Sequence, residues 1–347
     1  AYAYVDGAYV PYYVSNGYVY DNPNFTGTPV DNFGSILSGT QTLLAGSNIT
    51  RSTAIVGSET IVTANANTFT QRVDVSGYGT LNVKGTTFFN EKVTATGGYL
   101  TIGDDVATTP TTVTFQGGGE LFGSLLNVKK GATIIVPAGK KLEISSGGVV
   151  ISGKGGTVSF NGNLESKKAL VQFLNAHLKG NVDLDPSLFR VTGANTITEN
   201  GVGTGTGTLT LGATNGVNGA TANDTNNVLL FDPNSSLTVA NKVVLHNKSA
   251  LIVGYKPSQI TPQGVTDLLT ATNNMVDGAD GTTPKTFDYL FTLALDDKGT
   301  STGILQPADA TVTNNDSTYR FNIIQSATGV KLSIDNNVEA TAGSDMS

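Results

Sequence analysis

The sequence predicts an all-β protein that folds as a right-handed single-stranded parallel β-helix, a solenoid in which each coil covers the next. Short segments recur in which apolar residues alternate with Thr, Asn or Lys, and glycine stands at their ends, as in residues 79–85. Alternation with a period of two marks a half-buried strand. Such a strand cannot bury its apolar face alone, so its repetition indicates stacked coils. The same pattern recurs at residues 98–103, 139–144, 156–162, 207–212, 236–239 and 249–254.

The repeat is irregular in length. Leu81 and Leu100 are 19 positions apart, whereas Leu237 and Leu251 are 14 apart. Unequal intervals favour an irregular β-helix over a strict hexapeptide solenoid. Parallel crossovers are right-handed in the great majority of proteins, which gives the predicted hand.

Composition narrows the classes of partner. The 347 residues include 42 glycines, no cysteine, 14% charged residues and a net charge of −7. Phosphate backbones need clustered Lys and Arg, so no nucleic-acid partner is expected. No stretch approaches the roughly 20 apolar residues of a membrane span. Abundant Thr, Asn and Gly with few charges favours an extracellular or cell-surface protein, and the initial Ala without a signal segment indicates a mature or excised chain.

Residues 1–50 form a separate tyrosine-rich segment. Seven of the twelve tyrosines fall between residues 2 and 20, and a turn signal follows at residues 22–24. Three interpretations stay open: an end cap that covers the first coil, an aromatic surface for a ligand, or an edge strand that pairs with a neighbouring molecule.

Residues 51–255 carry the repeats and form the predicted parallel β-helix. Within them, residues 167–178 have apolar residues near helical spacing, but the alternation of Val171 and Phe173 favours one more coil with both side chains inward.

Residues 256–347 break the pattern and form a third region packed on the solenoid. Thr261 before Pro262 resembles a helix start, so a short helix is predicted near residues 262–270. Residues 319–323 and 330–334 then predict a β-hairpin, as part of an antiparallel sheet or a long covering loop.

Few residues suit catalysis. Both histidines, His177 and His246, lack a nearby ligand at metal-binding spacing, and the chain has no G-x-S-x-G motif, so no catalytic residues and no metal ligands are assigned. Asp183 and Asp185 would share one face of a strand and are the best acid/base pair for a polysaccharide lyase or glycosidase. Residues 277–281 resemble part of a calcium loop without its final Glu, so no cofactor is expected but a structural calcium stays open.

Aromatic side chains are the best candidates for binding, because rings stack on the apolar faces of sugars. Core packing is the alternative for Phe287, Phe291 and Phe321. The candidate ligand-binding residues are Tyr12, Tyr13, Tyr18, Tyr20, Tyr255, Phe287, Tyr289, Phe291 and Tyr319.

The G-x-L-x-V-x-G segments at residues 79–85 and 207–212 resemble those of bacterial autotransporter adhesin passengers. The tyrosine-rich start and the C-terminal sheet make the layout more similar to tapirins, cell-surface proteins of cellulose-degrading bacteria. That resemblance implies non-catalytic adhesion to insoluble plant polysaccharide through an apolar, aromatic surface, and it assigns no role to any residue.

The favoured hypothesis is therefore a non-enzymatic extracellular or cell-surface adhesin that binds insoluble polysaccharide such as cellulose. A self-assembling structural surface protein is the first alternative. A β-helix polysaccharide lyase or glycosidase is the second.

Overall fold

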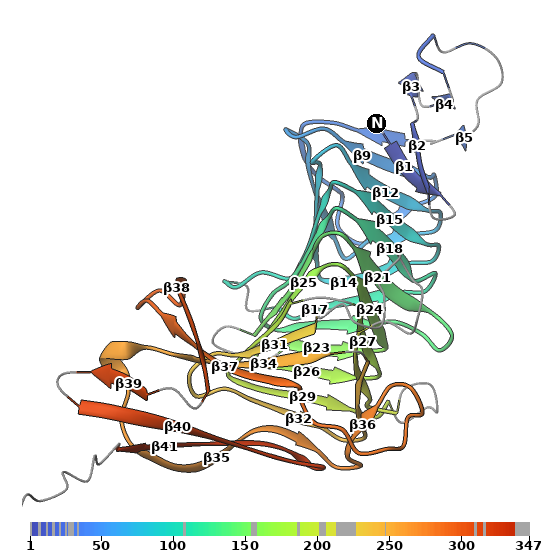
Figure 1. Ribbon diagram of the computed structural model, residues 1–347. Coiled ribbons are helices and arrows are strands. Elements are labelled where there is room, and N and C mark those ends of the chain that lie inside the picture. Colours follow the sequence, from blue (N-terminus) through green and yellow to red (C-terminus); the bar gives the residue numbers. More distant parts are fainter. Residues whose placement is uncertain are drawn as a thin grey trace, which may run out of the picture.

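A computed structural model describes the chain except for residues 1, 6–7, 12, 16–17, 21, 25, 27–30, 33–34, 107–108, 154–157, 186–187, 201–205, 213–226, 247, 309–310, 315–316 and 337–347. It confirms the predicted all-β solenoid with a C-terminal antiparallel sheet. Three long sheets form the sides of the solenoid, and each coil adds one strand to each sheet (Figure 1).

Sheet 1, the 12-stranded sheet, comprises β7 (Thr40–Thr42), β10 (Ile61–Asn65), β13 (Thr80–Lys84), β16 (Tyr99–Ile102), β19 (Leu125–Val128), β22 (Gly148–Ser152), β25 (Leu170–Leu174), β28 (Leu188–Thr192), β31 (Asn227–Phe231), β34 (Ser249–Tyr255), β37 (Tyr289–Leu295) and β38 (Ser301–Pro307).

Sheet 2, the 13-stranded sheet, comprises β8 (Asn48–Ile49), β11 (Thr68–Phe69), β14 (Thr86–Phe89), β17 (Thr111–Phe115), β20 (Ala132–Ile135), β23 (Val158–Asn161), β26 (Ala176–Lys179), β29 (Ala194–Thr198), β32 (Ser236–Val239), β35 (Gln263–Ala271), β41 (Gly329–Asn336), β40 (Ser317–Ser326) and β39 (Thr311–Asn314).

Sheet 3, the 11-stranded sheet, comprises β6 (Ser35–Leu37), β9 (Thr53–Val56), β12 (Val73–Ser76), β15 (Val93–Thr96), β18 (Gly119–Phe122), β21 (Lys141–Ser145), β24 (Asn163–Lys167), β27 (Val182–Asp185), β30 (Leu209–Leu211), β33 (Val243–Leu245) and β36 (Met275–Asp277).

The core is a set of side-chain stacks that run along the solenoid. Parallel pairing in register places Phe69, Phe89 and Phe115 on successive strands of sheet 2. Their ring centroids are 5.0 and 5.2 Å apart and the rings are stacked. Inward residues of the other sheets are almost all Val, Leu, Ile or Phe and are fully buried. Each coil therefore buries its apolar face on the coils above and below.

The glycines that flank β13 act in two different ways. Gly85 has φ of +68°, as expected for a turn that favours glycine. Gly79 does not have a positive φ, so the turn geometry does not explain its place at the start of β13. A Cβ at residue 79 would lie 3.0 Å from the Ile55 carbonyl oxygen of the adjacent coil. Its role is to allow two backbones to approach closely.

The region at residues 167–178 forms coil strands as predicted, with Val171 and Phe173 buried in the core. The predicted helix at residues 262–270 is wrong. Residues 257–259 form one short 3₁₀ turn, η2 (Pro257–Gln259), and β35 follows. Pairing of β35 with β32 and with β41 outweighs the local helix-start signal.

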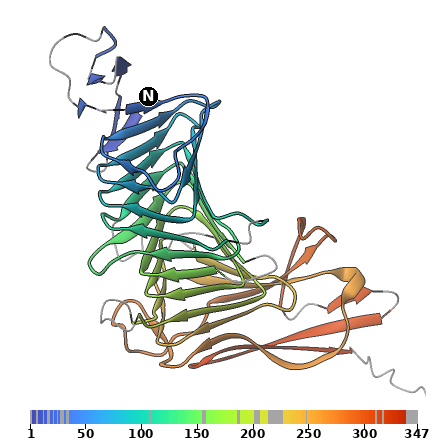
Figure 2. The same cartoon turned by 180° about the vertical axis from the view of Figure 1, so that it is seen from behind.

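The C-terminal strands end the solenoid. Sheet 2 continues from β35 into antiparallel β41, β40 and β39, and sheet 1 ends with the antiparallel pair β37–β38. The predicted hairpin between β40 and β41 is confirmed. These strands project sideways from the last coils, which gives the molecule an L-shaped outline (Figures 1 and 2).

The N-terminal strands form two small sheets: β1 and β2 lie beside the first coils, and β3, β4 and β5 extend beyond them (Figure 1). They are β1 (Tyr2–Val5), β2 (Ala8–Pro11), β3 (Tyr13–Ser15), β4 (Tyr18–Tyr20) and β5 (Asp31–Asn32). The boundaries predicted at residues 50 and 255 stay predictions, although parallel pairing begins before residue 51 with β6–β8 and extends past residue 255 to β37.

The stacked phenylalanines provide a test of the fold. Replacement Phe89→Ala removes a fully buried ring from the centre of its stack and should destabilise the protein by about 3–5 kcal/mol. The neighbouring Phe88 points outward and is 41% exposed, so Phe88→Ala should change stability by less than about 0.5 kcal/mol. Guanidinium unfolding of both variants measures the difference, and equal losses would contradict the assignment of inward and outward faces.

Candidate functional site

The outer surface of the solenoid is organised in columns. Because the coils stack in register, one outward position of each strand lines up with the same position of the next, about 4.7–4.9 Å away. The three sheets carry columns of different chemistry: apolar on sheet 1, hydroxyl-bearing on sheet 2 and charged on sheet 3.

Sheet 1 carries a line of outward-facing apolar residues, here called the apolar column. Thr80, Gly148 and the buried Ala250 are the small residues that interrupt it. Leu170 is 61% exposed and Tyr289 is 38% exposed, although polar side chains are the rule at outward strand positions. The apolar column consists of Ile61, Tyr99, Leu125, Leu170, Leu188, Val228 and Tyr289.

A second column lies beside it, two residues along each strand, here called the amide column. Its members on the earlier coils are uncharged, and all of them except Val150 have hydrogen-bonding side chains. Arg190 is its charged member, and its guanidinium is bound to the Asp232 carboxylate at 3.0 Å. The earlier members are Thr63, Asn82, Thr101, Asn127, Val150 and Gln172.

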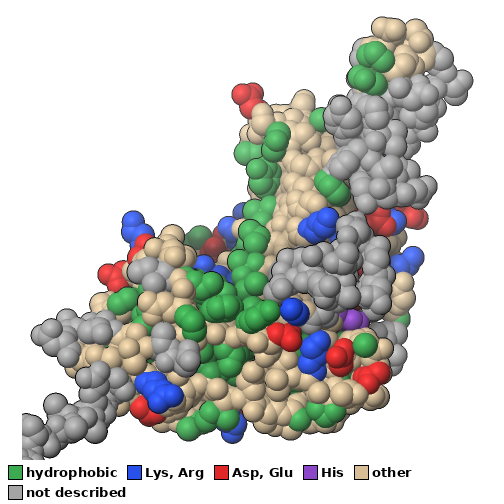
Figure 3. All heavy atoms as spheres, viewed as in Figure 1, with side chains coloured by type: hydrophobic (Ala, Val, Ile, Leu, Met, Phe, Trp, Pro, Cys, Tyr) green, Lys and Arg blue, Asp and Glu red, His purple; other side chains and the backbone are tan. Residues whose placement is uncertain are grey.

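Toward the C-terminal end the second column also becomes apolar, with Leu230, Ile252 and Phe291. The Tyr289 and Phe291 rings stack with centroids 6.3 Å apart, and the exposed Leu305 on β38 pairs with Leu293 further along β37. Figure 3 shows hydrophobic side chains in a narrow line along the solenoid that broadens at the corner where the C-terminal strands leave it. A continuous line of exposed apolar side chains makes this face the candidate binding surface.

Sheet 2 presents mainly threonine at the equivalent outward position. Cross-strand Thr pairs stabilise the sheet and leave a polar surface. His177 stands in this column, and its Nδ1 lies 2.8 Å from Thr196 Oγ1. The column comprises Thr86, Thr112, Thr133, Ser159, His177, Thr196, Thr238 and Thr270.

Sheet 3 carries an ionic column. Glu143 lies between Lys141 and Lys167, with Nζ–O distances of 3.0 and 3.2 Å, and Lys141 also contacts Glu165 at 2.7 Å. Burial alone would raise the pKa of Glu143, but the two lysines outweigh it and keep this pKa below its usual value. Glu120, Glu143, Glu165 and Asp183 occupy successive strands.

The predicted acid/base pair, Asp183 and Asp185, lies on β27, at the C-terminal end of the ionic column. Asp183 is exposed, yet desolvation of its carboxylate by neighbouring side chains raises its pKa to about 6, with repulsion from Glu165 and Asp185 adding to the shift. Asp185 is buried, and burial raises its pKa. One carboxylate oxygen of Asp185 has no hydrogen-bond partner among the described residues.

The nine predicted aromatic residues do not form one surface. Tyr289 and Phe291 lie on the outer face of sheet 1, next to the apolar column. Tyr255, Phe287 and Tyr319 are buried in the core, and Tyr255 stacks obliquely on Phe321 at 5.2 Å. Tyr13 is half-buried on β3, Tyr18 and Tyr20 lie on β4, and Tyr12 lies outside the described residues.

Sequence reasoning missed most of the apolar column, although the sequence contains a signal for it. A half-buried strand alternates, so two adjacent large apolar residues at its start place one of them outward. Such pairs recur at Tyr99-Leu100, Leu125-Leu126, Leu170-Val171, Leu188-Phe189, Val228-Leu229 and Tyr289-Leu290.

The candidate calcium loop is held by its own hydrogen bonds. The Asp280 carboxylate accepts hydrogen bonds from the hydroxyl and backbone N–H of Thr283 and from the N–H of Thr282, which lowers the pKa of Asp280 to about 2. Among the described residues no group of three His, Cys, Asp or Glu side chains is arranged to hold a metal ion. The structural calcium stays a prediction.

Comparison with protein-family models, curated proteins and solved structures finds no match to this chain. The similarity to tapirins and autotransporter passengers is therefore one of layout. Within the described part of the chain, no helix has the length and apolar character needed to cross a membrane.

The shifted carboxylate in the ionic column makes a prediction about pH. The folded pKa of Asp183, about 6, lies above its usual 3.8, so the folded state holds this proton more tightly and loses stability as pH rises from about 4 to 6. Asp183→Asn removes the repulsion and should raise the melting temperature at pH 7.5 by about 2 °C, with no change at pH 4.

Differential scanning calorimetry at both pH values measures the effect. Glu143→Gln is the matched control: it removes a carboxylate that contacts two lysines and should lower the melting temperature at pH 7.5. The prediction would be contradicted if the difference in melting temperature between Asp183→Asn and wild type were the same at both pH values.

Proposed function

We propose that this protein is a non-catalytic adhesin that binds an insoluble neutral polysaccharide, such as cellulose or another plant glycan, along sheet 1. The observation that carries the proposal is the apolar column with the uncharged part of the amide column, from Thr63 to Gln172, beside it. Sugar rings present apolar faces that stack on aromatic and aliphatic side chains, and hydroxyl edges that hydrogen-bond to amides and hydroxyls. The two columns offer both kinds of contact side by side.

The shape of the surface supports a linear ligand. Over most of its length the apolar column is one side chain wide and follows the long axis of the solenoid (Figure 3). Stable protein interfaces have a broad, dry centre, which such a narrow strip lacks. A polymer that repeats along its own axis can contact successive coils in the same way. Sheet 1 also lacks the alternating charges that sheet 3 presents to solvent.

An extracellular or cell-surface location is part of the proposal. It is supported by the chain's composition of few charges, no cysteine and abundant glycine. The layout that resembles tapirins and autotransporter adhesins supports it in the same way, because both groups act outside the cell.

Self-association is the second candidate, and two features favour it. The apolar column is exposed, and strands β6, β7 and β8 have no further neighbour in the described sheets. Edge strands of this kind are templates for pairing with another chain. Light scattering at increasing protein concentration separates the two candidates. Self-association should raise the measured molar mass, whereas adhesion along sheet 1 requires no such increase.

Substitution of the apolar column tests adhesion. A triple variant, Tyr99→Thr, Leu170→Thr and Leu188→Thr, keeps β-forming residues but makes sheet 1 similar to the threonine column of sheet 2. We expect its retention on microcrystalline cellulose or another insoluble glycan to fall at least tenfold, because stacking contacts are lost at three coils. Pull-down isotherms measure it.

The matched control is Phe88→Thr, which removes an exposed aromatic residue from sheet 2. It should leave retention unchanged. Equal loss in the control, or wild-type protein that stays in the supernatant with every insoluble glycan, would refute binding along sheet 1.

A further inference from the structure

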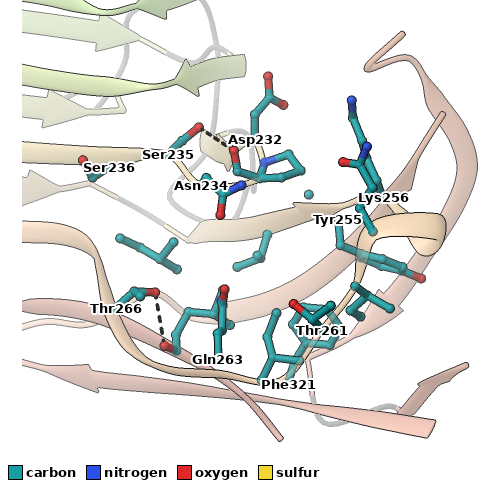
Figure 4. Close-up of a pocket in the computed structure, with 18 of the residues that line it drawn as sticks. Asp232, Asn234, Ser235, Ser236, Tyr255, Lys256, Thr261, Gln263, Thr266 and Phe321 are labelled. Carbon is teal, nitrogen blue, oxygen red and sulfur yellow. Dashed lines mark hydrogen bonds between the residues drawn. The ribbon is translucent and has the colours of Figure 1, made fainter. Parts of the chain in front are cut away.

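A pocket of about 400 Å³ lies between the last coils and the C-terminal sheet. The turn at residues 232–236 forms one wall, the segment from Tyr255 to Gln263 forms a second, and strands β35, β40 and β41 form the third (Figure 4). Small-molecule sites have volumes of about 300–1,000 Å³, so the pocket has the size of a site for a small ligand.

The floor of the pocket is apolar. Tyr255 and Phe321 form an aromatic pair with centroids 5.2 Å apart. Leu332 and Ile334 of β41 and Leu268 of β35 complete it. The two rings are tilted by 47° to each other, and together with the aliphatic side chains they present an apolar surface to a ligand.

The charged groups around the pocket are already engaged. The Asp232 carboxylate accepts hydrogen bonds from Arg190 Nε at 3.0 Å and Thr192 Oγ1 at 2.6 Å. Lys256 Nζ donates to the Asp297 carbonyl oxygen, and Asp267 lies 3.5 Å from Lys331 Nζ. Both carboxylates at the pocket are therefore already paired with a basic side chain, whereas Lys256 is held by a backbone carbonyl oxygen and not by a carboxylate.

The polar side chains that remain are uncharged. Asn234 faces the pocket from one side and Thr261 and Gln263 from the opposite side (Figure 4), and Gln259 also lines it. None of these four side chains has a hydrogen-bond partner within the described chain. They supply amide donors, amide acceptors and a hydroxyl, the groups that recognise ligand hydroxyls.

A second, more open groove of about 610 Å³ connects the pocket with sheet 1. It shares Asp232, Asn234, Lys256 and Gln259 with the pocket and extends to Gln172, a member of the amide column. A chain that lies along sheet 1 can therefore reach the pocket by this groove.

We infer that the pocket is a second carbohydrate site, which takes the terminal sugar residues of a neutral saccharide chain. The choice of ligand class rests on the proposed function. The apolar floor receives the face of a sugar ring, and Asn234, Thr261 and Gln263 bind its hydroxyls. Unlike the apolar column, this site binds short soluble saccharides, because it encloses one end of the chain.

Isothermal titration with cellotetraose, xylotetraose and mannotetraose tests the inference on the full chain. We expect wild type to bind at least one of them. The double variant Thr261→Val and Gln263→Leu keeps side-chain size but removes the hydrogen-bonding groups, and should weaken that binding at least tenfold. The matched control, Thr133→Val and Gln116→Leu, makes the same changes on sheet 2 several coils closer to the N-terminus and should bind as wild type.

The outcomes separate the two proposals. Loss of tetrasaccharide binding in the pocket variant, with retention on insoluble glycan kept, supports the second site. Wild type that is retained on insoluble glycan but binds none of the three tetrasaccharides would overturn the pocket and leave adhesion along sheet 1 standing. Tetrasaccharide binding that is unchanged in the pocket variant would also overturn it, provided that unfolding midpoints confirm that every variant is folded.

Discussion

In-register parallel pairing between successive coils is the constraint on which the rest of the structure depends. The hydrogen-bonded ladder holds each residue above its counterpart one coil earlier, so one sequence position repeated along the chain becomes one column in space. Inward, this produces the phenylalanine stack of sheet 2 and the aliphatic stacks of sheets 1 and 3. On the outside, in-register pairing means that the residue type repeated at one position determines the chemistry of a whole face.

The same constraint explains the polar residues inside the protein. Each coil turns three corners, where backbone groups leave the ladders and need other partners. Asn67, fully buried, donates from Nδ2 to the Leu44 carbonyl at 2.9 Å and accepts the Asn65 N–H on Oδ1 at 2.7 Å. Asn195 accepts the Ala176 N–H from the previous coil in the same manner. Buried amides at the corners thus link neighbouring coils and supply hydrogen-bond partners for the backbone there. The outward side chains of the columns are not needed for this purpose.

Local pattern in the sequence was sufficient for the fold class, because alternation and glycine spacing describe single strands. It was not sufficient to assign strands to sheets. Leu81 and Leu100 are true neighbours in sheet 1, but Leu237 and Leu251, compared in the same way, lie on sheets 2 and 1. The helix expected near Pro262 failed for a related reason, since strand pairing with distant β41 decided that segment. Aromatic content alone also could not separate Tyr289, which faces out, from Tyr255, which is buried.

A surface built from columns has a consequence for the strength of binding. Contacts with one coil are weak, because each adds one exposed side chain and one amide or hydroxyl. In the proposed binding mode, linked contacts along a continuous polymer add as intramolecular events, so affinity along sheet 1 would grow with the length of ligand that lies on it. A closed pocket behaves differently, since its contacts are complete with a single chain end. Under the two proposals, the coil register would therefore provide a surface whose affinity depends on ligand length, and the pocket beside the C-terminal strands would provide a site whose affinity does not.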